Sequence, residues 1–259
     1  MPSLPELLDL AERAALLGGE VVRGARSEEP PQVKGAGDYV TAVDRESERT
    51  ISGVLSAGTP EIPVLGEEKG GRAGDRYWVV DPLDGTTNYL HGFPVVGVSI
   101  ALVERGRPRV GVVHAPFLGE TYRAARGHGA SRRVGGGDPE PLSVSPRPPE
   151  RAIVATGFPF RRKEALLRYL EAFRRCLESF EDLRRPGAAS LDLAWVAAGV
   201  FEGFFELGLS SWDVAAGGLL IEEAGGVVTD WDGGPDYLTG DILAGSPPVH
   251  SELLAIARG

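Results

Sequence analysis

Apolar residues near the start of the chain recur at helical spacing. Leu4, Leu7 and Leu8 begin a series that follows one face of an α-helix. This pattern predicts an amphipathic helix over residues 4–24. The polar stretch that follows contains several prolines and glycines, so residues 30–37 are predicted to form a loop.

The rest of the first half alternates a second helical pattern with short apolar runs. TAVDRESERTISGVL, from residue 41 to residue 55, predicts a helix with Asp44 near its start. The apolar runs are bounded by turn residues, as strands are. The predicted strands lie in IPVLGEEKGG (62–71), in YWVV (77–80), in a hairpin over 95–116 that closes near Gly106, and in ETYRAARGHGA (120–130).

Residues 135–150, GGGDPEPLSVSPRPPE, are rich in glycine and proline and mark the predicted domain boundary. We expect an N-terminal α+β domain over 1–142 and a C-terminal α/β domain over 150–259, because helical and strand patterns alternate after the boundary. The predicted order is a strand in RAIVAT, a helix in KEALLRYLEAFRRCLESF, a buried helix in LDLAWVAAG, a strand in VFEGFFEL, a helix in WDVAAGGLLIEEAGG and a strand in GVVTDWDG.

Composition narrows the possible partners and location. The 259 residues include 42% hydrophobic residues and carry a formal charge of −10, which suits cation binding or solubility and gives a nucleic-acid surface little support. Cys176 is the sole cysteine, the start has no secretory pattern, and no apolar run reaches membrane-spanning length. We therefore expect a cytoplasmic protein without nucleic-acid or membrane partners.

Asparagine and glutamine are scarce in this chain. They occur once each, at Asn88 and Gln32, and the basic residues are 24 Arg and 3 Lys. The bias fits a thermostable protein, and equally a GC-rich genome. A melting temperature in the mesophilic range of roughly 45–65 °C would contradict thermostability. Asn88 lies in the motif described next, which indicates that this position requires an amide.

The segment DPLDGTTN, residues 81–88, gathers groups suited to a cation. Asp81 and Asp84 flank Pro82, whose fixed φ lets both carboxylates and the Leu83 carbonyl converge on one point. All three are hard oxygen donors, which Mg²⁺ prefers. Taken alone, an Asp before Gly85 is more often a turn residue.

The next residues, Gly85, Thr86 and Thr87, are predicted to begin a helix. The first N–H groups of a helix have no partner within the helix, so they form an anion site suited to phosphate, and a glycine allows close approach. This turn therefore places cation ligands and phosphate donors side by side.

Three further acidic positions have both a functional and a structural interpretation. Glu67 ends a predicted strand, and the Glu67–Glu68 pair could simply be solvated beside Lys69. Asp44 and Asp213 each stand near a predicted helix start, where an acidic residue caps the helix.

Four motifs together resemble those of the inositol monophosphatase family of Mg²⁺-dependent, often lithium-sensitive phosphatases. They are TAVD (41–44), GEE (66–68), DPLDGTTN (81–88) and WDVAAGGLLIEEAGG (212–226), in the family's order and spacing. The resemblance implies a layered αβαβα sandwich shared with fructose-1,6-bisphosphatases, usually as a homodimer. It also implies two or three Mg²⁺ ions per active site and a small phosphorylated polyol or sugar as substrate.

The resemblance further implies a role for each matching residue. Glu67, Asp81 and the Leu83 carbonyl would hold the first metal, and Asp81, Asp84 and Asp213 the second, with a weaker third site near Glu67. Asp44 with Thr86 would activate the water, and the amides of Gly85 and Thr86 would bind phosphate. The implied substrate contacts are Gly187, Ala188, Ala189 and Glu206.

The implied activity is Mg²⁺-dependent phosphomonoester hydrolysis, with inositol 1-phosphate as the first substrate. Two cations could clamp the attacking and leaving oxygens of an in-line displacement, so no covalent nucleophile is needed. Fructose 1,6-bisphosphate and 3′-phosphoadenosine 5′-phosphate are alternative substrates, because Arg184 and Arg185 could contact a second phosphate or face solvent. A regulatory binding protein is the alternative from another class, since bacterial relatives associate with the transcription machinery.

Overall fold

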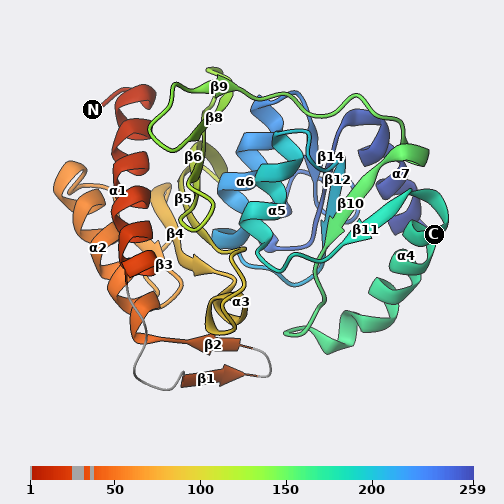
Figure 1. Ribbon diagram of the computed structural model, residues 1–259, viewed down its shortest axis with the longest axis horizontal. Coiled ribbons are helices and arrows are strands. Elements are labelled where there is room, and N and C mark those ends of the chain that lie inside the picture. Colours follow the sequence, from red (N-terminus) through yellow and green to blue (C-terminus); the bar gives the residue numbers. More distant parts are fainter. Residues whose placement is uncertain (1, 25–31, 36–37) are drawn as a thin grey trace.

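The computed structural model describes residues 2–24, 32–35 and 38–259. Helices and sheets alternate in five layers, which Figure 1 shows from α1 and α2 on one side to α4 and α7 on the other. The layered αβαβα sandwich predicted from the sequence is confirmed.

The first sheet contains seven strands of the N-terminal half. Its strands pair in the order β3-β4-β5-β6-β7-β8-β9, and all neighbours are antiparallel except β3 and β4. The strands are β3 (Val64–Gly66), β4 (Arg76–Asp84), β5 (Gly97–Glu104), β6 (Arg107–Ala115), β7 (Glu120–Ala125), β8 (Ala130–Val134) and β9 (Glu140–Pro141).

Two amphipathic helices cover one face of this sheet. They are α1 (Leu4–Gly24), which has the predicted bounds, and α2 (Ala42–Gly58). Their apolar sides pack with the sheet around Trp78 and Ile100 in one hydrophobic cluster. The helical spacing of apolar residues seen in the sequence is therefore the contact face of α1.

Two helices lie between the sheets and are buried on nearly all sides. They are α5 (Ala189–Ala197) and α6 (Ser211–Glu223), which pack against each other and contact strands of both sheets. A helix that is apolar all round belongs in an interior, and LDLAWVAAG was predicted as such a helix. Because α5 and α6 share one hydrophobic cluster with residues of both sheets, the two halves of the chain meet in a common core.

The second sheet has the strand order β11-β10-β12-β14-β13. Here β10 is parallel to β11 and to β12, whereas β14 is antiparallel to its neighbours. The strands are β10 (Ile153–Thr156), β11 (Asp182–Arg184), β12 (Gly203–Glu206), β13 (Val227–Thr229) and β14 (Ile242–Gly245).

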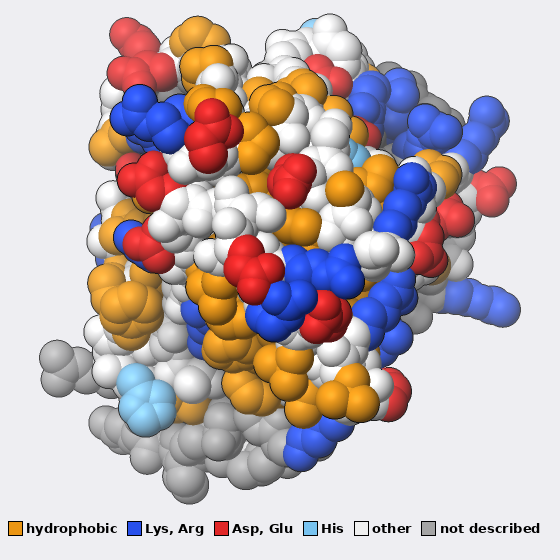
Figure 2. All heavy atoms as spheres, turned by 90° about the vertical axis from the view of Figure 1, so that its right-hand side faces the viewer, with side chains coloured by type: hydrophobic (Ala, Val, Ile, Leu, Met, Phe, Trp, Pro, Cys, Tyr) orange, Lys and Arg blue, Asp and Glu red, His pale blue; other side chains and the backbone are white. Residues whose placement is uncertain are grey.

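Helices α4 (Leu166–Ser179) and α7 (Pro247–Arg258) cover the outer face of the second sheet. Figure 2 shows this side of the molecule, where apolar side chains lie among Arg and acidic ones. On α4, Leu167 is 82% exposed and Leu177 is 57% exposed. Short helices complete the chain: α3 (Thr86–Leu90) and the 3-10 turns Pro149–Arg151, Lys163–Ala165 and Tyr237–Thr239.

The structure differs from the sequence-based expectation at the loop over residues 30–37. Residues 30, 31, 36 and 37 lie outside the described residues. Of the remainder, Gln32–Gly35 forms β1, which pairs antiparallel with β2 (Asp38–Val40). The loop prediction is wrong there, because backbone pairing of two short segments leaves no apolar periodicity to detect.

The sequence patterns also missed β14 and α7, which follow the last predicted strand. The division into domains at 142–150 remains a prediction. Among the described residues, no helix is both long and apolar enough to cross a membrane.

Candidate active site

A pocket opens where strands of both sheets end. Parallel strands place their carboxyl ends at one edge of a sheet, where ligand sites commonly form. Glu67 directly follows β3 and Asp84 ends β4, while Arg185 directly follows β11 and Glu206 ends β12. Each of these residues lines the pocket.

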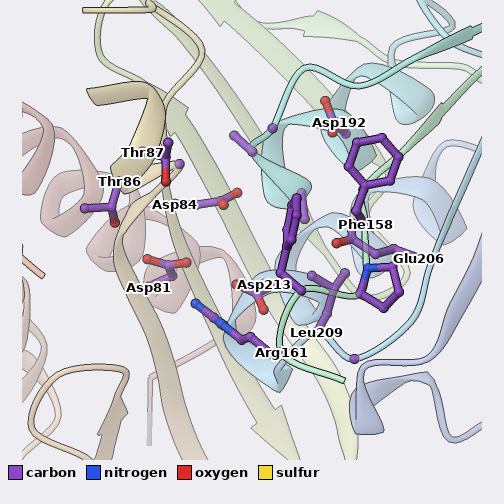
Figure 3. Close-up of a pocket in the computed structure, with 18 of the residues that line it drawn as sticks. Asp81, Asp84, Thr86, Thr87, Phe158, Arg161, Asp192, Glu206, Leu209 and Asp213 are labelled. Carbon is purple, nitrogen blue, oxygen red and sulfur yellow. The ribbon is translucent and has the colours of Figure 1, made fainter. Parts of the chain in front are cut away.

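Three carboxylates meet on one side of this pocket. Asp81, Asp84 and Asp213 each offer an oxygen within 4.8 Å of the others, and Figure 3 shows them grouped together. Burial and the neighbouring carboxylates of Glu67, Asp84 and Asp213 raise the pKa of Asp81 well above its usual range. Burial and the charge of Asp213 raise the pKa of Asp84 to about 7. A cation would relieve this repulsion, so these hard oxygen donors fit a divalent ion.

A β-bulge around Pro82 turns both carboxylates of β4 into the pocket. Asp81 pairs with Ser99 and Asp84 pairs with Gly97, so β4 contains one more residue than β5 over this interval. Residues three apart on a regular strand face opposite sides, and the extra residue brings them to the same side. The Leu83 amide donates to Asp81 Oδ1 over 2.9 Å and fixes the bulge.

The predicted helix after the motif is present as α3, with Gly85 at its N-cap. Gly85 has a φ of +89°, in the left-handed region that glycine adopts without strain. A Cβ there would also lie 3.0 Å from the Val95 carbonyl and 3.3 Å from Ala188 Cβ. The glycine therefore allows the start of α3 to approach residues 187–189, which we call the 187–189 loop.

Asp44 lies at the N3 position of α2 and has two roles in the structure. Its Oδ2 accepts the Thr41 amide over 2.8 Å in a capping box. Thr86 Oγ1 lies 3.2 Å from Asp44 Oδ1 and 3.2 Å from the Leu83 carbonyl, two acceptors for one hydroxyl hydrogen. Burial raises the pKa of Asp44, which makes this carboxylate a better proton acceptor than an exposed one.

Glu67 stands beside the three-carboxylate group rather than within it. The turn that carries it is fixed by Glu48 of α2, which accepts the amides of Glu68 over 2.7 Å and Lys69 over 3.0 Å. Arg161 Nη2 lies 4.0 Å from Glu67 Oε1. The Glu67 side chain is 13% exposed and lines the pocket, which favours the functional interpretation of this position.

Asp213 lies at N3 of α6, where its Oδ2 accepts the Ser210 amide over 2.7 Å. Ser99 Oγ donates to the Trp212 carbonyl over 2.8 Å and fastens the start of α6 to β5. A residue from the C-terminal half thereby joins two carboxylates of the N-terminal half.

The 187–189 loop lies beside the start of α3. Asn88 connects the two, because its Nδ2 donates to the Val95 carbonyl over 2.8 Å and to the Pro186 carbonyl over 2.9 Å. A side-chain amide supplies two such donors, which confirms that this position uses an amide. Burial and the Asp213 charge raise the pKa of Glu206 well above its usual range.

Sequence reasoning missed several residues that line the pocket. Phe158 and Arg161 follow β10, and Asp192 lies in the first turn of α5 with its Oδ1 lacking a hydrogen-bond partner among the described residues. Arg185 stacks over Phe158 at 5.4 Å and Phe160 at 5.7 Å. A rule that inspects the first two residues after each parallel strand would have found Phe158, whereas nothing in the sequence pattern marks Asp192.

Comparison with known proteins agrees with this architecture. "Nus factor SuhB" of Escherichia coli strain K12 is 41% identical over 264 residues, with 97% of this chain and 96% of the relative covered. "Fructose-1,6-bisphosphatase/inositol-1-monophosphatase" of Aquifex aeolicus is 38% identical over 266 residues, covering 100% and 97%. The solved inositol monophosphatase from Anabaena sp. PCC 7120 superposes with a TM-score of 0.87 at 37% identity, covering 98% and 96%.

A family model covers almost the whole chain. The model described as the inositol monophosphatase family matches residues 3–258, a span that includes every acidic residue of the pocket. The chain therefore belongs to the inositol monophosphatase family.

Proposed function

We propose that this protein is a Mg²⁺-dependent phosphomonoester hydrolase that acts on inositol 1-phosphate. The observation that carries the proposal is the meeting of Asp81, Asp84 and Asp213, from opposite halves of the chain, within 4.8 Å of one another. The start of α3 lines the same pocket, so phosphate donors stand next to the cation ligands.

The proposed ligand sets follow the family motifs. Glu67, Asp81 and the Leu83 carbonyl would hold one Mg²⁺, and Asp81, Asp84 and Asp213 a second, with a weaker third ion near Glu67. Bound cations would offset the negative charge of the phosphate and make a water molecule more acidic. The amides of Gly85 and Thr86 would hold the phosphate oxygens.

Asp44 and Thr86 would activate the attacking water. The Leu83 carbonyl would serve the cation, and the Thr86 hydroxyl would donate its hydrogen to Asp44 Oδ1. The Thr86 oxygen would accept a hydrogen bond from the water, so that Thr86 takes a proton from the water as its own hydroxyl hydrogen passes to Asp44. The raised pKa of Asp44 favours holding that proton.

Glu206 and the 187–189 loop would contact the polyol. Glu206 ends β12 and lines the pocket opposite α3. A carboxylate accepts hydrogen bonds from ring hydroxyls, which suits an inositol ring.

The decisive experiment measures phosphate release by the purified protein with and without Mg²⁺. The substrates are inositol 1-phosphate, fructose 1,6-bisphosphate and 3′-phosphoadenosine 5′-phosphate, and Asp84→Asn is the control. We expect Mg²⁺-dependent release from inositol 1-phosphate that the variant loses. No release from any of the three would overturn the proposed activity.

A bisphosphate substrate is a second candidate, because Arg161 and Arg185 line the pocket. Arg184 is the matched control, since it pairs with Asp182 at the surface and is absent from the pocket lining. If a second phosphate binds here, Arg185→Ala raises KM for fructose 1,6-bisphosphate at least about tenfold, whereas Arg184→Ala leaves it unchanged. An equal rise in KM for fructose 1,6-bisphosphate and for inositol 1-phosphate in Arg185→Ala would remove this candidate.

A binding role is a third candidate, since the relative from Escherichia coli is named a Nus factor. A pull-down from cell extract with wild type and with Asp84→Asn would test it, because a binding role independent of catalysis retains the same partners in the variant.

The homodimer stays a prediction that analytical ultracentrifugation tests.

A further inference from the structure

Ser190, in the first turn of α5, is hydrogen-bonded to Asp84, one of the three clustered carboxylates of the pocket. Its amide donates to Asp84 Oδ2 over 2.7 Å, and its hydroxyl donates to the same oxygen over 2.6 Å. Ser190 is fully buried, so water has little access to its two donors. Both donors act on one oxygen of Asp84, which leaves Oδ1 for a cation.

Gly97, the first residue of β5, provides the space for this hydroxyl. A Cβ at Gly97 would lie 2.6 Å from Ser190 Oγ, whereas its next neighbours, atoms of Val113 and Asp84, would be at 3.8 and 3.9 Å. Gly97 does not adopt a positive φ, so conformation does not require glycine there. The close contact with Ser190 Oγ is therefore the steric reason for a glycine at this position.

We propose that Ser190 is a positioning residue for Asp84, holding one carboxylate oxygen so that the other faces the second cation. This inference rests on the proposed metal-dependent function. Groups that hydrogen-bond a metal ligand orient it, and their loss typically costs about 10- to 100-fold in metal affinity. The fixed carboxylate loses less rotational freedom when the cation binds, which is the physical source of the gain.

A double-mutant cycle tests the geometry. Mn²⁺ affinity is measured by calorimetry for wild type, Ser190→Ala, Gly97→Ala and the double variant, with thermal unfolding of the metal-free proteins as a check on folding. Ser246→Ala is the matched control, because Ser246 is equally buried and its Oγ has no hydrogen-bond partner among the described residues.

We expect Ser190→Ala to weaken Mn²⁺ binding about 10- to 100-fold and Ser246→Ala to leave it unchanged. Gly97→Ala should weaken binding in the wild-type background, because its Cβ displaces the hydroxyl. In the Ser190→Ala background the same change should have little effect, since the clashing oxygen is gone. In turnover assays the Mg²⁺ concentration for half-maximal rate should rise, while the rate at saturating Mg²⁺ stays within about threefold.

Two results would overturn the inference. One is Mn²⁺ affinity of Ser190→Ala within twofold of wild type. The other is an undiminished effect of Gly97→Ala in the Ser190→Ala background, which would show that Gly97 acts through another neighbour. Absence of Mn²⁺ binding by the wild type would instead contradict the metal-dependent function itself, so the two failures are distinguishable.

Discussion

Helices α2 and α6 begin in the same way but contribute different groups to the pocket. Each has a hydroxyl residue at the N-cap and an aspartate at N3, Thr41 with Asp44 and Ser210 with Asp213. In both, Oδ2 of the aspartate accepts the N-cap amide, over 2.8 Å in α2 and 2.7 Å in α6. The other oxygen remains for chemistry, so capping a helix and serving a site are compatible roles for one carboxylate.

The difference between the two helices lies in what surrounds the second oxygen. Asp213 joins the carboxylates of Asp81 and Asp84, which need a positive charge. Asp44 Oδ1 faces the hydroxyl of Thr86 instead, and this contact is the one that the proposed proton transfer uses. The same capping pattern therefore places a proposed metal ligand at the start of α6 and a proposed base at the start of α2.

The largest expected effect is that of Asp213→Asn. We expect turnover to fall at least about 10⁴-fold, since removing a cation site removes several kcal/mol of transition-state stabilisation. The asparagine oxygen still accepts the Ser210 amide, so the metal-free variant should unfold at or above the wild-type temperature. Calorimetric Mn²⁺ titration and thermal unfolding check both parts. Near-full Mg²⁺-dependent activity would remove Asp213 from the metal site.

Asp44→Asn should distinguish the proposed role of α2 in proton transfer from the proposed role of α6 in metal binding. We expect turnover to fall about 10²- to 10⁴-fold, the usual contribution of a general base. Mn²⁺ affinity should remain within about threefold of wild type, because Asp44 is not one of the three clustered carboxylates, Asp81, Asp84 and Asp213. Kinetics and calorimetry on the same preparation test this split. Loss of metal binding in this variant would show that Asp44 supports the cations.

The contribution of Asp84 to the pH dependence of metal-free stability should respond to Asp213→Asn and not to Asp44→Asn. The pKa of Asp84 is raised to about 7 from its usual 3.8, so the metal-free folded protein holds an extra proton between about pH 4 and 7. Its stability therefore falls as pH rises through that window, and metal affinity weakens by up to about tenfold per pH unit below 7.

Asp213→Asn should shift this stability window to lower pH, since the Asp213 charge is the second cause of the raised Asp84 pKa, after burial. Asp44→Asn should leave the contribution of Asp84 where it is in wild type and remove only the contribution of Asp44, whose own pKa is raised by burial. Metal-free melting temperatures measured from pH 4 to pH 8 provide the test, and identical windows in wild type and Asp213→Asn would contradict it.

The smallest expected effect is that of Thr41→Val. The Thr41 hydroxyl accepts the amides of Val43 over 3.1 Å and Asp44 over 3.3 Å, and it also donates to Asp44 Oδ2. Losing the cap should lower the free energy of unfolding by about 1 kcal/mol, measured by urea denaturation. Ser210→Ala is the parallel change at α6, and a cost above about 3 kcal/mol in either would mean that the hydroxyl does more than cap.

Local patterns determine the elements near the site well. The spacing of Leu4, Leu7 and Leu8 predicts α1, and YWVV before two aspartates predicts β4 and the turn into α3. The same reasoning failed at Gln32–Gly35, which was predicted as a loop, because β1 forms by pairing with β2. A short polar segment does not show in its sequence which segment it will pair with.

What the sequence by itself determined is the chemical content of the site: carboxylates around Pro82, a glycine at the start of α3, and an amide at Asn88. These act through local geometry, which a few neighbouring residues fix. Only the tertiary structure decided that the amide of Asn88 reaches Pro186 and that Ser190 holds Asp84. Those bonds join segments about a hundred positions apart, and they form because α5 and α6 pack between two sheets, a consequence of burying apolar surface.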